Sequence, residues 1–231
     1  MKRFYKNASA QAAEGGFAVA LDAKTLLTPA KLPLVVPSCA LAEAIAAEWQ
    51  AQADEVRPHT MPLMRLASTA IDLVAKRHAD VVAEIANFAA TDLVCYRAEH
   101  PAELVARQQA IWQPLVDWAT LRYDAPLAVT AGIVPVTQKP TTLHAFAVAV
   151  AGYEPMTLTT LHAATTASGS LVIALALMEG RLDAEGAFAA SQLDESFQIE
   201  QWGEDYEAAD RRAALKVDIA AAARFVALLR S

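Results

Sequence analysis

Carboxylates are the residues of this chain whose types and spacing come nearest to a chemical site. The segment Ser191–Asp210, SQLDESFQIEQWGEDYEAAD, carries seven acidic residues and no lysine or arginine. Adjacent pairs at Asp194-Glu195 and Glu204-Asp205 have the residue types that general acid and general base catalysis uses. Neighbouring residues on a helix point about 100° apart, however, and do not converge on one substrate atom. We therefore predict no catalytic residue here.

The sequence also lacks the motifs for metal binding, cysteine redox chemistry and nucleotide binding. The five histidines stand alone, without an H-E-x-x-H or a second histidine three or four residues away. Cys39 and Cys95 form no C-x-x-C pair, and two scattered thiols fit a reducing compartment, where they act as small buried groups. The glycines build neither a Rossmann nor a P-loop fingerprint. We expect no metal ion and no cofactor.

The acidic segment has a second interpretation, as a docking surface. Trp202 and Tyr206 follow Ile199 at intervals of three and then four residues, which places acidic and aromatic side chains on shared helical stripes. A solvated helix that buries these aromatics in its own core would show the same pattern, and this alternative stays open. In the docking interpretation, carboxylates orient a basic partner while aromatic rings supply contact area.

The composition narrows the class of protein. The chain has 231 residues, a hydrophobic fraction of 55%, a charged fraction of 19% and a net charge of −7, which together favour a folded globular protein. Nucleic acids and anionic membranes attract positive fields, so neither is an expected partner. The longest apolar run, Leu171–Met178, falls far short of the ~20 residues that span a bilayer. No targeting peptide is visible at the N-terminus. We therefore expect a protein without membrane insertion, in a bacterial cytoplasm.

Residues 1–37 have the pattern of a small antiparallel sheet. Glycines 15 and 16 and the residues 22–24 are turn signals, and prolines stand where strands would begin or end. Between these signals, the sequence predicts strands at residues 3–6, 17–21, 25–28 and 34–36.

From Ser38 the hydrophobic period becomes helical. Ser38 and Asp183 are predicted N-caps, and Pro114 should kink a helix or split it in two. Residues 91–97 could be a helix end or a short extended segment, and residues 124–140 read as a linker or surface loop. The pattern predicts a β-containing domain at 1–60 and a helical domain at 61–231, hence an α+β fold. The last helices should cover residues 171–178, a stretch after 183 and residues 205–229.

Several blocks, in order along nearly the whole chain, resemble one known family. It is the family of F-type ATP synthase assembly chaperones that bind the α subunit of the F₁ sector. The most specific blocks are PHTMPL with LASTAID at 58–72 and TDLVCYRA at 91–98, and others are RFYK at 3–6, TPA at 28–30, AAEWQAQ at 46–52, GSL at 169–171, and DE-x-FQ with WG at 194–203. The chain departs from the family where Ala23-Lys24 replaces a frequent Gly-Arg, and where Phe197 replaces the tryptophan of some relatives.

The resemblance implies a small antiparallel β domain followed by a larger orthogonal all-helical domain. It also implies a protein that is not an enzyme: it holds a newly made α subunit until the β subunit replaces it. We expect it to be a monomer when free, and relatives in eukaryotes to occupy the mitochondrial matrix. The family's critical acidic residue corresponds to Glu195, with Asp194 as its nearest rival, and Phe197, Gln198 and Trp202 complete the expected partner-binding set.

Two other classes of function stay open. One is an enzyme of unknown chemistry that uses carboxylates in an interdomain cleft, which the lack of a convergent motif disfavours. The other is a structural subunit of a stable complex, against which the acidic surface counts mildly.

Overall fold

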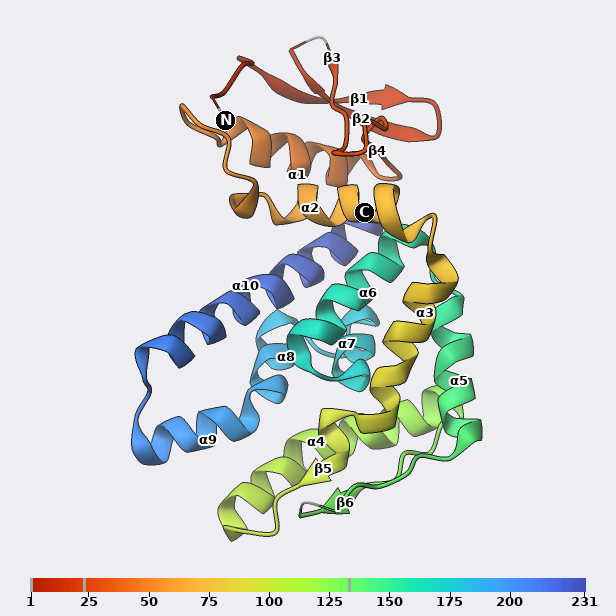
Figure 1. Ribbon diagram of the computed structural model, residues 1–231, viewed down its shortest axis with the longest axis vertical. Helices are drawn as coiled ribbons and strands as arrows, with labels where there is room; N and C mark the ends of the chain where they lie inside the picture. The colour runs from red at the N-terminus through yellow and green to blue at the C-terminus, as the bar shows by residue number, and fades with distance from the viewer. Residues whose placement is uncertain (1, 23, 133) are drawn as a thin grey trace. The chain divides into compact units, whose positions relative to one another are not determined.

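The computed structural model describes residues 2–22, 24–132 and 134–231 (Figure 1). The chain forms two compact units. The N-terminal unit comprises the chain as far as His78, together with Glu154–Thr160 and Arg224–Ser231. The helical unit comprises Ala79–Tyr153 and Leu161–Ala223. The predicted domain boundary after residue 60 stays a prediction.

An antiparallel sheet forms one layer of the N-terminal unit. Its central strand β2 pairs with β1 on one edge and with β3 and β4 on the other. The strands are β1 (Ala8–Ala13), β2 (Gly16–Leu21), β3 (Lys24–Thr25) and β4 (Val35–Val36). Gly16 has a φ of +149°, and a Cβ at this position would lie 2.3 Å from the carbonyl oxygen of Val36. The close approach of β4 therefore requires glycine.

The prediction of a strand at residues 3–6 was wrong, since the first strand is β1. The Arg3 guanidinium donates hydrogen bonds to the carbonyl oxygens of Tyr5 (3.2 Å) and Lys6 (2.9 Å). In a strand, these carbonyls would accept from a neighbouring strand instead. Within the predicted turn at 22–24, Ala23 lies outside the described residues. The predicted strands at 25–28 and 34–36 are shorter in the structure, as β3 and β4.

Helices make up most of the rest of the fold, as Figure 1 shows. They are α1 (Cys39–Gln50), α2 (Pro62–Thr69), α3 (His78–Asn87), α4 (Ala102–Tyr123), α5 (Pro140–Ala151), α6 (Pro155–Ser168), α7 (Leu171–Met178), α8 (Ala184–Ser191), α9 (Leu193–Trp202) and α10 (Tyr206–Leu229). Shorter elements are the 3-10 turns η1 (Pro58–Thr60), η3 (Phe88–Thr91) and η4 (Leu93–Cys95), the π-helical η2 (Ala70–Val74), and the parallel strands β5 (Tyr96–Arg97) and β6 (Thr130–Ala131). The α+β expectation is confirmed.

The N-terminal unit has its core between the sheet and α1. Val19, Leu34, Leu41 and Ile45 are fully buried in one cluster, and Phe225 from the end of α10 completes it. The predicted N-cap of α1 is confirmed: its hydroxyl accepts the N–H of residue 41 at 3.1 Å and donates to the carbonyl of residue 228 at 2.5 Å. One serine thus both starts α1 and fastens the C-terminal turn of α10 to it.

The helical unit is built around α7, whose eight residues are all buried, as its continuous apolar run predicts. Ser170 caps α7 by accepting the N–H of Ile173 at 3.0 Å. Asp183 caps α8 in the same way through Gly186, at 2.7 Å, so this predicted cap is confirmed.

Three other local predictions had mixed outcomes. Helix α4 is continuous, with Pro114 inside it, so the predicted split does not occur. For residues 91–97 the sequence allowed a helix end or an extended segment, and the structure contains both: the helical turn η4 is followed by the extended strand β5. Cys95 is buried as expected, whereas Cys39 is exposed. In the part of the chain that is described, no helix has the length and apolar character needed to cross a bilayer.

Candidate partner-binding site

Helix α9 carries the acidic motif and packs one side against α4. Leu193 and Phe197 are four residues apart and are 5% and 4% exposed. Just before α9, the Trp112 indole N–H of α4 donates to the Ala190 carbonyl at 2.8 Å. Gly203, with a φ of +85°, ends the helix in a conformation that suits glycine. The buried side of α9 is therefore fixed by α4.

Asp194 belongs to this fixed side. Its carboxylate is half-buried and accepts a hydrogen bond from the Gln108 side chain at 2.7 Å. Burial raises the pKa of this carboxyl above its usual range, against the opposing effects of Gln108 and the Arg97 charge. Gln108 is itself held in place by two further hydrogen bonds. Its side-chain oxygen accepts the Ala98 N–H, and its backbone carbonyl accepts from the Arg97 guanidinium, both at 2.8 Å. Asp194 thus joins α9 to α4, and Gln108 in turn joins α4 to β5 and Ala98.

Arg107 of α4 also contacts α9, at the solvent-facing edge of the packing between the two helices. Its guanidinium pairs with Glu200 and with Glu103, both at 2.7 Å, and lies 5.2 Å from the centre of the Phe197 ring. Arg212 of α10 donates to the Ser196 hydroxyl at 2.6 Å, which ties α10 back to α9. These arginines come from α4 and α10, on either side of the acidic motif.

The opposite side of α9 is more exposed: Gln198 and Trp202 are exposed, and Glu195 is half-buried. Glu195, Gln198 and Trp202 are spaced three and four residues apart and so share one face. Trp202 is 78% exposed, and Tyr206, at the start of α10, is 94% exposed. Hence two of the aromatic residues from the acidic segment lie outside the core, whereas Phe197 lies within it.

Several carboxylates around these rings are unpaired. Glu195, Glu204 and Glu207 have no ion pair or side-chain hydrogen bond with any described residue, and the latter two are exposed. Asp205 is used locally, since it accepts the N–H of Ala208 at 2.9 Å and caps α10. We call the group Glu195, Gln198, Trp202, Glu204, Tyr206 and Glu207 the α9–α10 surface.

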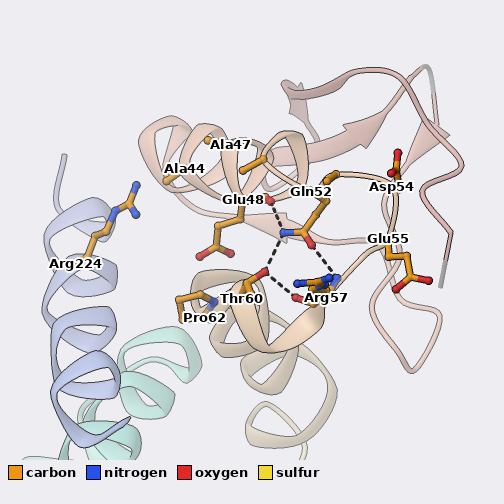
Figure 2. A pocket seen from close by; sticks show the side chains of 12 residues that line it. Ala44, Ala47, Glu48, Gln52, Asp54, Glu55, Arg57, Thr60, Pro62 and Arg224 are labelled. Carbon is orange, nitrogen blue, oxygen red and sulfur yellow. Dashed lines mark hydrogen bonds between the residues drawn. The ribbon is translucent and has the colours of Figure 1, made fainter. Parts of the chain in front are cut away.

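A concave region lies in the N-terminal unit, as a pocket of about 950 Å³ (Figure 2). Its central side chain, Gln52, bonds the Glu48 carbonyl, the Thr60 hydroxyl and the Arg57 N–H at 2.8–3.1 Å. The Glu48 carboxylate accepts the N–H groups of residues 63 and 64, both at 2.9 Å, at the start of α2. Burial raises the pKa of Glu48. These polar groups therefore connect α1, η1 and α2.

Residues 2–22, 24–132 and 134–231 contain no set of side chains suited to binding a metal ion. No group of three histidine, cysteine or acidic side chains there is arranged to hold a metal ion. The residues that sequence reasoning missed are Arg107, Gln108 and Arg212, which position α9. Arg212 follows the acidic segment by two residues, whereas no motif in the sequence around Arg107 and Gln108 indicates their role.

Comparisons with known proteins agree with this fold. The family described as "ATP12 chaperone protein" matches residues 2–120. Two solved structures of Atp12 from Paracoccus denitrificans, one of them a point mutant, share 43% sequence identity with this chain at a TM-score of 0.94, and cover 99% of this chain and 98% of theirs. The Atu1473 protein of Agrobacterium tumefaciens shares 45% identity at a TM-score of 0.93, covering 99% of this chain and 86% of that one.

A curated relative extends the likeness to a eukaryote. "Protein atp12, mitochondrial" from Schizosaccharomyces pombe is 25% identical over 214 residues, which is 87% of this chain and 74% of the relative. The fold and these matches define a chaperone. The chain belongs to the ATP12 chaperone family, the ATP synthase assembly chaperones that its sequence blocks resemble.

Proposed function

We propose that this protein binds the unassembled α subunit of the F₁ sector through the α9–α10 surface and releases it to the β subunit. The observation that carries the proposal is the exposure of Trp202 and Tyr206, at 78% and 94%, beside carboxylates that no described cation neutralises. Exposed aromatic rings with a charged rim are typical of protein interfaces rather than of free surface.

The physical task explains why such a surface suits an assembly chaperone. An unassembled subunit exposes apolar area that its later neighbour will cover, and such patches aggregate. The chaperone must compete with self-association, yet bind less favourably than the final neighbour. Aromatic contacts supply area, and solvent-screened carboxylates orient the client while keeping the affinity moderate. Transfer to the β subunit then runs downhill without ATP.

We propose separate roles for the two rival carboxylates. Asp194 is half-buried and hydrogen-bonded to Gln108, so we assign it a positioning role. Glu195 shares the more exposed face of α9 with Gln198 and Trp202, so we assign it the orientation of the client. Phe197 is buried beneath Arg107 and supports the surface from within.

We further propose a protein that acts without catalysis, as a monomer when free, in a bacterial cytoplasm. The net charge of −7 supports a polypeptide client rather than a nucleic acid. The Schizosaccharomyces relative carries "mitochondrial" in its name, which fits a matrix location for eukaryotic relatives.

A pull-down tests the proposal. The tagged protein should recover the α subunit from a lysate in which ATP synthase is being made. Glu195→Lys should keep the fold, because charge changes at partly exposed helix positions usually alter stability by about 0.5 kcal/mol or less, yet lose the α subunit. Asp54→Lys reverses an exposed charge in the N-terminal unit and serves as the matched control. Failure of the unmodified protein to recover any α subunit would refute the proposed client.

A further inference from the structure

Strand β1 is an edge strand with one side unpaired. It pairs with β2 in a continuous antiparallel register, from Ala8 opposite Leu21 to Ala13 opposite Gly16. The partners β3 and β4 both join β2 on its other side. The sheet therefore ends at β1, and Figure 1 shows the sheet above α1.

The backbone groups that face outward can be assigned from hydrogen bonds around the register. Val19 donates to Leu34 and accepts from Leu26, so its backbone points away from β1. Ala10 lies opposite Val19, and such a pair exchanges no hydrogen bonds in an antiparallel ladder. By alternation, Ala8, Ala10 and Ala12 direct their N–H and C=O groups away from the sheet.

Only the first of these three residues has its N–H bonded. The Ala8 N–H donates to the Gln50 side chain at 2.8 Å. The outward N–H groups of Ala10 and Ala12 have no partner among the described residues. The edge also lacks the usual protection, because ASAQAA contains no charge and no proline, and its register has no bulge.

A groove runs beside this edge. It has a volume of about 530 Å³, and small side chains form much of its wall, including Ala8 and Ala10 of β1 and Ala47 and Ala51 of α1. Alanine side chains leave room that larger residues of an added strand could fill. Glu43 is the charged residue on the groove wall, and its recorded contact is Cys39, 3.6 Å away, with no cation paired to it in the described chain.

We propose that the β1 edge and this groove bind one extended segment of the client polypeptide as an added strand, with a basic side chain opposite Glu43. This inference rests on the proposed function, whose client is the α subunit. Main-chain hydrogen bonds make strand addition tolerant of sequence, while alternate side chains enter the groove. A chaperone could thus hold a client strand that lacks its final neighbours.

Charge selects the client over a second copy of this chain. A second β1 would bring ASAQAA, which carries no cation to complement Glu43. Two copies would also each carry a net charge of −7, so long-range repulsion opposes their pairing. A client segment with a lysine or arginine supplies the cation that Glu43 lacks.

Hydrogen–deuterium exchange of the complex with purified α subunit tests the proposal. On complex formation, the amides of Ala10 and Ala12 should gain protection, so that uptake in the β1 peptide falls by about two deuterons, whereas Ser9, Gln11 and Ala13 already face β2. Ala12→Pro removes one outward donor and should weaken α binding about tenfold. Ala12→Thr keeps the N–H and should bind as the unmodified protein does.

The outcomes separate this proposal from the one on which it rests. A complex that forms without added protection in β1 overturns the strand-addition proposal and leaves the client assignment standing. Equal affinities of folded Ala12→Pro and Ala12→Thr overturn it as well. If no complex forms, both proposals fail. Protection of β1 that rises with the concentration of this protein alone would point to a second copy and contradict the proposal.

Discussion

Asp92 gives the sharpest test of the energetics of the helical unit. Its carboxylate is fully buried and accepts hydrogen bonds from the Ser170 hydroxyl at 2.5 Å, from the Val172 N–H at 3.1 Å and from the Val94 N–H at 3.3 Å. No described cation pairs with it. Burial outweighs the three hydrogen bonds and raises the pKa of Asp92 to about 6.

The sign of the effect follows from proton linkage. An unfolded chain holds an aspartate with a pKa near 3.9, so between about pH 4 and pH 6 the folded protein binds more protons than the unfolded one. The free energy of unfolding therefore falls as the pH rises through this window. The full offset is about 3 kcal/mol, of which about 2 kcal/mol is lost between pH 4.5 and pH 7.5.

Urea unfolding of the natural protein and of Asp92→Asn measures this contribution. The variant removes the titration, so the difference between the two free energies of unfolding isolates Asp92 from the other carboxylates. From pH 4.5 to pH 7.5, the free energy of unfolding of the natural protein should fall by about 2 kcal/mol relative to that of Asp92→Asn. Glu207→Gln removes an exposed carboxylate and is the matched control.

A flat difference for Asp92→Asn would refute the reasoning, because it would mean that burial does not perturb this carboxyl. A change of opposite sign would show that the charged form is stabilised by the fold. Either result would remove desolvation as the dominant effect at the junction of η4 and α7.

Three further substitutions test other contacts by urea unfolding. Gly16→Ala should destabilise by more than about 1 kcal/mol because its Cβ would meet the Val36 carbonyl, and an unchanged midpoint would contradict the close approach of β4. Glu48→Gln should cost about 1–2 kcal/mol, because an amide cannot accept both N–H groups at the start of α2, and a neutral result would remove its capping role. Asp194→Ala should cost about 1–3 kcal/mol by leaving the Gln108 side chain without its acceptor, whereas a stability equal to that of the natural protein would exclude the positioning role.

Local signals account for the features that the sequence predicted well. Ser38 and Asp183 each cap a helix through an N–H three residues ahead, so neighbouring residues decide the outcome. Strand β1 was missed for the opposite reason. Alanine-rich ASAQAA has little intrinsic strand preference, and its pairing with β2 across the tight turn overrides that preference.

The candidate site divides in the same way. The alternation of acidic and aromatic residues can be read directly from the sequence of Ser191–Asp210. Which of them face solvent is decided by α4, since Gln108 and Asp194 are 86 positions apart and Arg107 and Glu200 are 93 apart. Sequence spacing could therefore indicate a surface but could not separate the buried Phe197 from the exposed Trp202.

The affinity of purified α subunit for three versions of this protein tests the central claim most directly. Replacing Trp202 and Tyr206 together by alanine should weaken binding by at least about tenfold, because aromatic residues at the centre of an interface dominate its energy. Leu121→Ala alters a side chain that is 86% exposed on α4 and should leave the affinity within about twofold. An α subunit that binds the double variant as tightly as the natural protein would contradict a role for the α9–α10 surface in holding the client.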